Sequence, residues 1–189
     1  MIDNDATLAE RLALDLDGAF EHLVLAYQNR LFGFALRLTG RSADAEDSVQ
    51  DALVRAYRAL KRYPDQRRRT LRLRPWLYRI TLNVVRNRAR GERAELVELP
   101  DRLSADVGDQ PEPAAESAER TRDLARLLLR LPDRYRAPVV LRHVQGLSYS
   151  EAAAVLDQPV GTTKANVHRG LRLLRAALEA SPPLGEKIA

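Results

Sequence analysis

Cysteine is absent from the 189-residue sequence, so disulfides, thiolate metal sites and cysteine catalysis are excluded. The three histidines, His22, His143 and His168, lie far apart and cannot form a metal-binding pair on one helix. The sequence also lacks a nucleotide-binding glycine loop and a nucleophile–base pair. It therefore predicts no catalytic residue, no metal and no cofactor.

Long apolar runs are missing as well. No stretch approaches the roughly 18 apolar residues that a membrane-spanning helix needs. The first residues are acidic and lack the basic start and apolar core of a signal peptide. We therefore expect a cytoplasmic protein without direct membrane insertion.

Charge is distributed in blocks, although the net charge is only +5. Residues 61–93 hold 12 basic side chains and two acidic ones, whereas residues 94–119 hold eight acidic side chains and one basic one. Residues 120–180 are basic again. Such blocks indicate two basic binding surfaces joined by an acidic segment. That segment contains Pro100, Pro111 and Pro113 and no apolar period, which predicts a linker.

Apolar spacing predicts an all-α fold of two small helical domains joined by an acidic flexible linker. The expected boundaries are a tail over 1–17, a first domain over 18–93, the linker over 94–117, a second domain over 118–180 and a tail over 181–189.

In the first domain, Gly40 is placed to end a helix over 20–38, and Ser42 to cap the next helix, which Pro64 stops. A basic loop over about 64–73 precedes a third helix, which has Pro75 in its first turn and is expected to end near Gly91.

In the second domain, Asp133 is placed to cap a helix that reaches Gly146 and contains Pro138, a residue that kinks helices. Ser148 and Glu151 form a capping box before a short helix, and a turn leads to a last helix over 160–180. The inward positions expected on these two longer helices are Val139, Val140, Val144, Thr163, Val167, Leu171, Leu174 and Leu178.

Residues 148–176 have the pattern of a helix-turn-helix, whose second helix reads base edges in the major groove of DNA. The side chains expected to face outward are Thr162, Lys164, Asn166, Arg169 and Arg172. Amide and ammonium groups suit base edges, and guanidinium groups suit phosphates. The alternative is a plain helical hairpin with a solvated basic face.

A second basic surface is interleaved with aromatic residues over 63–90. Arg79, Asn83, Arg86 and Arg90 share one helical face, and Trp76 lies at the start of that helix. Aromatic groups beside arginines suit unstacked single-stranded bases. The alternatives are that Trp76 packs in the core and that the arginine face is merely solvated.

A third surface is acidic, in the sequence D-A-E-D-S-V-Q-D at residues 44–51. The pairs Glu46/Gln50 and Asp47/Asp51 are spaced by four residues and face outward together. Carboxylates at a helix start compensate the helix dipole. A protein-binding face is the alternative interpretation.

Four segments, in this order, resemble the extracytoplasmic-function sigma factors of the sigma-70 family. They are Y-Q-N-R-L-F-G-F-A-L-R-L-T-G, D-A-E-D-S-V-Q-D-A-L-V-R-A-Y, R-P-W-L-Y-R-I-T-L-N, and L-P-D-R-Y-R-A-P-V-V-L-R-H-V-Q-G-L-S-Y-S-E-A-A-A-V-L followed by P-V-G-T-T-K-A-N-V-H-R-G. The resemblance implies a non-catalytic subunit that directs RNA polymerase to promoters. It also implies an anti-sigma protein as a regulatory partner and a linker that threads toward the polymerase active-site and RNA-exit channels.

The resemblance also implies a role for each surface. Core RNA polymerase would be bound through its clamp helices and its flap, with the clamp facing Asp44, Glu46, Asp47, Gln50 and Asp51. Melted single-stranded and duplex DNA at the −10 element would meet Arg67, Arg68, Arg69, Arg74, Trp76, Arg79, Asn83 and Arg86. Duplex DNA at the −35 element would meet Thr162, Lys164, Asn166, His168, Arg169 and Arg172.

Two other functions compete with this interpretation. An ordinary helix-turn-helix regulator explains residues 148–176 but gives the surfaces at 44–51 and 63–90 no role. An enzyme acting on nucleic acid lacks any recognisable catalytic constellation in this sequence.

Overall fold

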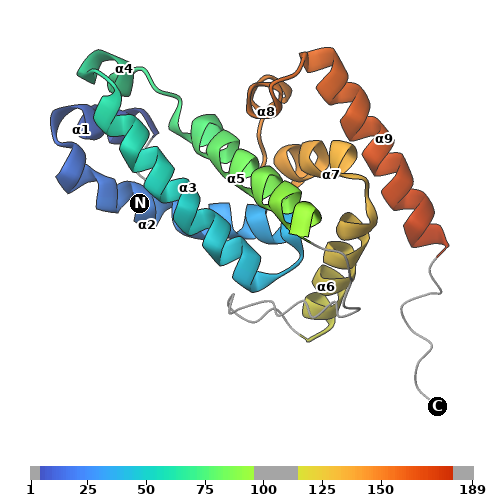
Figure 1. The fold of residues 1–189 in the computed structure, drawn as a ribbon. Coiled ribbons are helices and arrows are strands. Elements are labelled where there is room, and N and C mark those ends of the chain that lie inside the picture. Colours follow the sequence, from blue (N-terminus) through green and yellow to red (C-terminus); the bar gives the residue numbers. More distant parts are fainter. Residues whose placement is uncertain (1–4, 96–114, 181–189) are drawn as a thin grey trace.

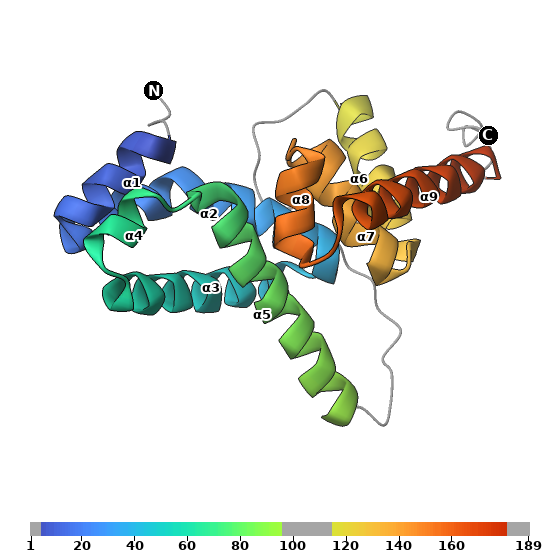
Figure 2. The same ribbon diagram turned by 90° about the horizontal axis from the view of Figure 1, so that it is seen from above.

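The computed structural model describes residues 5–95 and 115–180 as two adjoining groups of helices (Figures 1 and 2). Among these residues every regular element is helical, which confirms the predicted all-α class. The first group consists of α1 (Asp5–Leu14), α2 (Leu16–Thr39), α3 (Ser42–Arg62), α4 (Asp65–Arg69) and α5 (Leu73–Glu95). The second consists of α6 (Ala115–Arg130), α7 (Asp133–Val139), the π-helix η1 (Val140–Val144), α8 (Tyr149–Leu156) and α9 (Val160–Glu179).

The long helix α2 is closed at both ends by local chemistry. The Asp15 carboxylate accepts a 3.0 Å hydrogen bond from the Gly18 backbone N–H. Gly40 adopts the left-handed conformation, with φ of 78°, and its N–H donates to the Leu36 carbonyl. This confirms the predicted end of the helix, because a left-handed cap strongly favours glycine.

Two predicted caps are wrong by one residue. α3 begins at Ser42 itself, and the Ser42 hydroxyl donates to the Glu46 carboxylate instead of accepting a backbone N–H. α7 begins at Asp133, with Pro132 as its N-cap. In both cases the chain turns helical one residue early, so the acidic first turn compensates the dipole without a side-chain cap.

Residues 5–14 of the predicted N-terminal tail form the helix α1. Leu8, Ala9, Leu12 and Ala13 are buried against the first group of helices. The Tyr27 hydroxyl, from α2, donates to the Asp5 carboxylate. Burial of Tyr27, with the Asp5 contact adding, raises the pKa of its phenol. The difference from the prediction arises because four apolar positions suffice to dock a short amphipathic helix on a preformed core.

The predicted basic loop over 64–73 contains the short helix α4, and α5 continues four residues past Gly91. α5 therefore extends into the segment predicted to be the linker, and α6 begins within that segment at Ala115. The rest of the predicted linker and the predicted tail over 181–189 lie outside the described residues.

The second group changes helix type next to its proline. Pro138 cannot donate a backbone hydrogen bond, and the π-helix η1 follows directly, with the Gln145 N–H donating to the Val140 carbonyl. Of the expected inward residues, Val144, Leu171 and Leu178 are exposed instead, which corrects the prediction. The buried residues of α9 are Thr163, Val167, Gly170 and Leu174. This stripe is narrow because a helix that packs against neighbours on only one side buries only that side.

The two groups share one continuous apolar core. The buried cluster runs from Leu8 in α1 to Leu174 in α9. Arg136 of α7 donates to the Leu38 carbonyl of α2 over 2.7 Å. A Cβ atom on Gly40 would lie 2.9 Å from a Leu129 methyl group, so the end of α2 and α6 approach closely. The groups are thus packed together in the chain alone.

Candidate nucleic-acid interface

The acidic surface of α3 faces solvent opposite its buried Ala45, Val49 and Ala52. It comprises Asp44, Glu46, Asp47, Gln50 and Asp51. Glu46, Asp47 and Gln50 are exposed, whereas Asp44 and Asp51 are partly covered. This side of α3 therefore offers carboxylates to a partner.

All four of these carboxylates have intrachain partners, with Asp44 paired to Arg41 at 3.5 Å and Glu46 accepting from the Ser42 hydroxyl. Asp51 accepts two hydrogen bonds from Arg55 at 2.8 and 2.9 Å, and the Arg55 guanidinium lowers the pKa of the Asp51 carboxyl. Asp47 forms a 3.2 Å ion pair with Arg88 of α5, yet 64% of its side chain stays exposed. Exposed pairs of this kind are weak, so a cationic partner can displace them.

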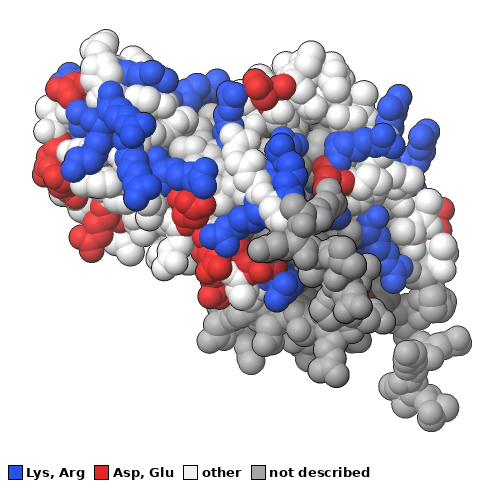
Figure 3. Space-filling model, in the orientation of Figure 1, with Lys and Arg blue, Asp and Glu red and all other residues white. Residues whose placement is uncertain are grey.

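The three consecutive arginines of α4 have different roles. Arg68 is largely buried and donates to the Tyr63 and Leu12 carbonyls and to the Asp65 carboxylate, so it ties α4 to α1. Arg67 lies over the Tyr63 ring at 3.7 Å, and Arg69 is exposed. In Figure 3, Lys and Arg side chains gather over α4 and the adjoining end of α3. Arg67 and Arg69 are therefore available to nucleic acid, and Arg68 is structural.

Trp76 is half-buried at the start of α5, and its ring centroid lies 6.2 Å from that of Tyr63. The Tyr63 ring in turn carries Arg67. Trp76 thus packs against the core on one side and belongs to an aromatic and arginine cluster on the other. The structure therefore shows Trp76 partly packed in the core, and its contact with nucleic acid stays a prediction.

Along the rest of α5, the predicted nucleic-acid residues separate into two environments. Asn83 is exposed. Arg74 and Arg79 contact the second group of helices: Arg74 donates to the Gln145 carbonyl, and Arg79 pairs with Asp157 at 3.3 Å. The sequence could not show these contacts, because the partners are more than 70 residues apart along the chain.

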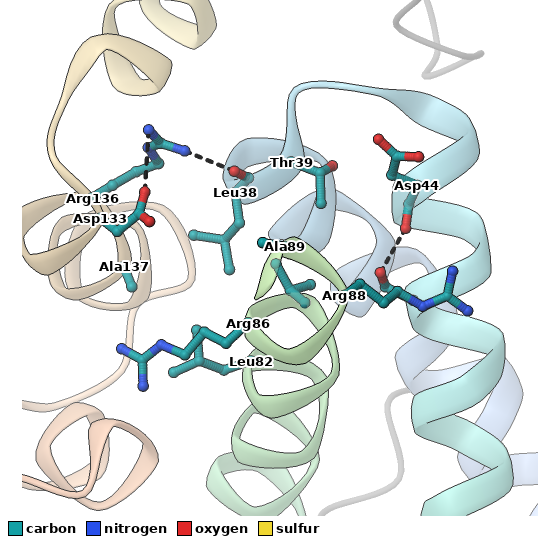
Figure 4. Close-up of a pocket in the computed structure, with 12 residues that line it drawn as sticks. Leu38, Thr39, Asp44, Leu82, Arg86, Arg88, Ala89, Asp133, Arg136 and Ala137 are labelled. Carbon is teal, nitrogen blue, oxygen red and sulfur yellow. Dashed lines mark hydrogen bonds and ion pairs between the residues drawn. The ribbon is translucent and has the colours of Figure 1, made fainter. Parts of the chain in front are cut away.

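Arg86 lines a pocket of about 260 Å³ between α2, α3, α5 and α7 (Figure 4). Burial lowers the pKa of its guanidinium, and nearby Arg90 adds to the effect. Asp133 and Arg136 of α7 line the same pocket. Arg86 is thus half-buried at the junction of the two groups and not on the open face of α5.

The helix-turn-helix forms as predicted. Ser148 accepts from the Glu151 N–H, and Glu151 accepts from the Ser148 N–H at 2.8 Å, so both halves of the capping box are present. The hydrogen bond from the Ser148 backbone N–H to the Glu151 carboxylate, together with one from the Ser148 hydroxyl, lowers the pKa of this carboxyl. Asp157 ends α8 in the left-handed conformation, with φ of 54°. Ala152 and Ala153 are buried, and small side chains there allow α8 to lie close to its neighbours.

The outer face of α9 carries the predicted DNA-reading residues. Thr162, Lys164, His168, Arg169 and Arg172 are exposed, and Asn166 is half-buried. This face is therefore open to a major groove while the two groups of helices remain packed together.

Sequence reasoning missed Arg142 and the aromatic ring that it shares with the predicted residue Lys164. Arg142 of η1 and Lys164 of α9 lie on the Tyr149 ring, at 5.0 and 5.6 Å from its centroid. Arg142 also donates to the Leu147 carbonyl. The 22-residue separation of the two cations hides this cluster in the sequence. Tyr149 thereby restricts where the Lys164 ammonium can lie.

Among the described residues, no group of three potential metal ligands comes together, and no helix is long and apolar enough to cross a membrane. Arginine and lysine side chains, with aromatic neighbours, dominate the candidate surfaces on α4, α5 and α9, and carboxylates dominate the one on α3. Their chemistry suits binding to nucleic acid and to protein.

Both halves of the chain match models of known protein families. The description "Sigma-70 region 2" matches residues 23–95, and "Sigma-70, region 4" matches residues 121–174. The chain is 32% identical to the ECF RNA polymerase sigma factor SigW of Bacillus subtilis, over 85% of this chain and 89% of SigW.

Two solved structures share the fold. CnrH, in complex with the cytosolic domain of CnrY, has a TM-score of 0.70 and 28% identity, covering 94% of this chain and 99% of CnrH. The sigma factor RpoE, in complex with the anti-sigma factor NepR from Bartonella quintana, has a TM-score of 0.66 and 25% identity, covering 86% of this chain and 98% of RpoE.

Proposed function

Since the chain belongs to the extracytoplasmic-function sigma factors of the sigma-70 family, we propose that it binds core RNA polymerase and directs initiation at specific promoters. It contributes no catalytic group, and nucleotide addition belongs to the polymerase. Residues 18–93 act as the polymerase-binding and −10 domain, 118–180 as the −35 domain, and 94–117 as the connection. The observation that carries this assignment is the presence of three exposed surfaces of the required chemistry on α3, α4–α5 and α9.

Polymerase binding is assigned to the acidic surface of α3. Glu46, Asp47 and Gln50 are exposed on one side of a helix whose other side is fixed in the core. An exposed helix with a rigid backing presents its carboxylates in a constant arrangement, which suits a basic protein surface. The clamp helices of the core enzyme are the proposed partner.

Recognition of the −10 element is assigned to α4 and the N-terminal part of α5. Arg67, Arg69 and Asn83 are exposed there, next to the half-buried Trp76. Guanidinium groups neutralise phosphates, and aromatic rings receive unstacked bases. Arg74 and Arg79 complete this face once the second domain moves away from it.

Recognition of the −35 element is assigned to α9. Thr162, Lys164 and Asn166 occupy its N-terminal turns, where a recognition helix meets base edges. His168, Arg169 and Arg172 follow on the exposed side and suit the phosphate backbone. The second domain also meets the flap of the polymerase in this proposal.

An anti-sigma protein is proposed as the regulatory partner. The related RpoE structure contains the anti-sigma factor NepR. In this chain, the acidic surface of α3 is the part whose coverage would block polymerase binding most directly.

The proposal is tested by mixing the purified chain with bacterial core RNA polymerase and measuring co-elution. Glu46→Arg with Asp47→Arg reverses two exposed charges of the α3 surface and is expected to abolish co-elution. The matched control, Glu10→Arg with Glu21→Arg, changes the net charge equally at exposed positions of α1 and α2 and is expected to co-elute normally. Equal binding by the two variants would contradict the assigned surface.

A further inference from the structure

One face of α5 is occupied by the helix-turn-helix domain. Arg74 donates to the backbone carbonyl of Gln145, and the Tyr78 hydroxyl donates to the Gln145 side-chain oxygen at 2.6 Å. Two ion pairs flank these bonds, Arg72 with Glu151 at 3.2 Å and Arg79 with Asp157 at 3.3 Å. Figures 1 and 2 both show α8 beside the N-terminal half of α5.

The contacted arginines are those that the −10 assignment requires. Arg74 and Arg79 belong to the proposed −10 face, and Arg72 lies directly before it. We propose that the second domain of the free chain competes with −10 DNA for this face, with the carboxylates of Glu151 and Asp157 in the positions that phosphates would take. This inference rests on the proposed function, because it requires α5 to bind DNA.

The second domain contacts the start of α5 at three positions on two elements, η1 and α8. Gln145 follows η1, Glu151 lies in the first turn of α8, and Asp157 ends α8. Gly146, with φ of 67°, turns the chain directly after the carbonyl that accepts from Arg74. Three contacts from two elements that converge on one face form a specific docking contact and not a single chance ion pair.

Asp157 supports the competition most clearly. Its left-handed conformation is best served by glycine or asparagine, so the backbone does not require a carboxylate there. Its carboxylate is 79% exposed and pairs with Arg79 across the domain boundary. The charge therefore serves the contact with α5 and not the turn itself.

The contact must also be reversible. Both ion pairs are solvent-exposed on at least one side, and such pairs contribute little individually. The buried part of the contact is held by Tyr78 and the continuous core. A partner that binds more tightly to the chain with separated domains can therefore release α5. Core polymerase is the proposed partner.

An asymmetry in DNA binding follows. The −35 residues of α9 are exposed while the domains are packed, whereas Arg74 and Arg79 are engaged. The free chain is thus expected to bind duplex DNA through α9 and to bind single-stranded DNA poorly.

The test compares free-chain variants for binding of a fluorescein-labelled single-stranded oligonucleotide of random sequence, by anisotropy. Glu151→Gln with Asp157→Asn removes both carboxylates. Glutamine remains competent in a capping box, and asparagine tolerates the left-handed conformation. Glu10→Gln with Glu21→Gln is the control for the change in net charge, at exposed positions of α1 and α2.

We expect the first pair to bind the single strand several-fold more tightly than the control pair, with duplex binding equal in the two. Tyr78→Phe, which is uncharged and keeps the ring, is also expected to increase single-strand binding, because it removes the hydrogen bond to Gln145. Single-strand affinity no greater than that of the control, in both the double variant and Tyr78→Phe, overturns the inference.

Transcription with core polymerase separates this inference from the function on which it rests. Promoter-directed transcripts combined with unchanged single-strand binding would reject only the competition. Absence of transcripts from the wild type and from every variant would reject the proposed function itself.

Discussion

The packing of α9 on α7 depends on a glycine, and replacing it tests the geometry of the DNA-reading domain. A Cβ atom at Gly170 would lie 2.6 Å from the Val139 Cγ2 methyl and 3.3 Å from the Tyr135 carbonyl oxygen. Neither neighbour is the end of a flexible side chain, because valine is branched at Cβ and the oxygen belongs to the backbone. Gly170→Ala therefore forces α7 and α9 apart.

Two effects of opposite sign set the size of the change. Alanine in place of glycine within a helix gains about 1 kcal/mol of helix propensity. Overpacking a tight core costs about 1–3 kcal/mol. The net expectation is a loss of up to about 2 kcal/mol of unfolding free energy.

Gly161 provides the matched control in the same helix, since a Cβ there would meet nothing within 4 Å. Gly161→Ala keeps the propensity gain and avoids the clash, so the two variants should differ by about 1–3 kcal/mol. Urea unfolding followed by circular dichroism measures both. Equal stability of the two alanine variants would contradict the close packing of α7 and α9 at Gly170. Unchanged duplex binding by a destabilised Gly170→Ala protein, in which α9 is displaced, would contradict the role of this packing in DNA binding.

Three further predictions concern single groups. Ser148→Ala should destabilise the second domain by about 1 kcal/mol in urea unfolding, because it removes an N-cap; no loss would contradict the capping box. Arg169→Ala and Arg172→Ala should each reduce the salt dependence of duplex binding by about one counterion in a titration of affinity against salt, and an unchanged slope would remove that arginine from the phosphate contacts. Arg55 lowers the pKa of the Asp51 carboxyl. The pair therefore stabilises the fold at pH values above the ordinary pKa of aspartate, and this stabilisation is lost as the pH falls through the lowered pKa. Asp51→Asn should therefore show a shallower loss of stability in acid than the wild type, measured by urea unfolding from pH 5 to about pH 3, and parallel curves would contradict this.

Local rules explain what the sequence predicted well. Gly40 and the Ser148–Glu151 capping box act within a few residues, so their effect is visible in the sequence. The helix-turn-helix also follows from short-range spacing, small residues and a turn at Asp157. The three exposed surfaces followed from the chemistry and period of their own helices.

Tertiary contacts explain what the sequence did not show. Arg68 lies between Arg67 and Arg69 in a run of identical residues, yet it is structural because it reaches the Leu12 carbonyl of α1. Arg86 has the spacing of an exposed residue, but α7 packs near it and encloses it in a pocket. Such burial depends on how the two domains dock, which no local pattern specifies.

The function proposed for this chain is to give core RNA polymerase its promoter specificity. The most direct measurement is transcription of a pool of promoter fragments by core polymerase from a closely related bacterium, with and without the chain. We expect transcripts with defined start sites only when the chain is present, and their loss in the Glu46→Arg, Asp47→Arg variant. Tight duplex-DNA binding by the chain, without association with the core enzyme and without new transcripts, would contradict it.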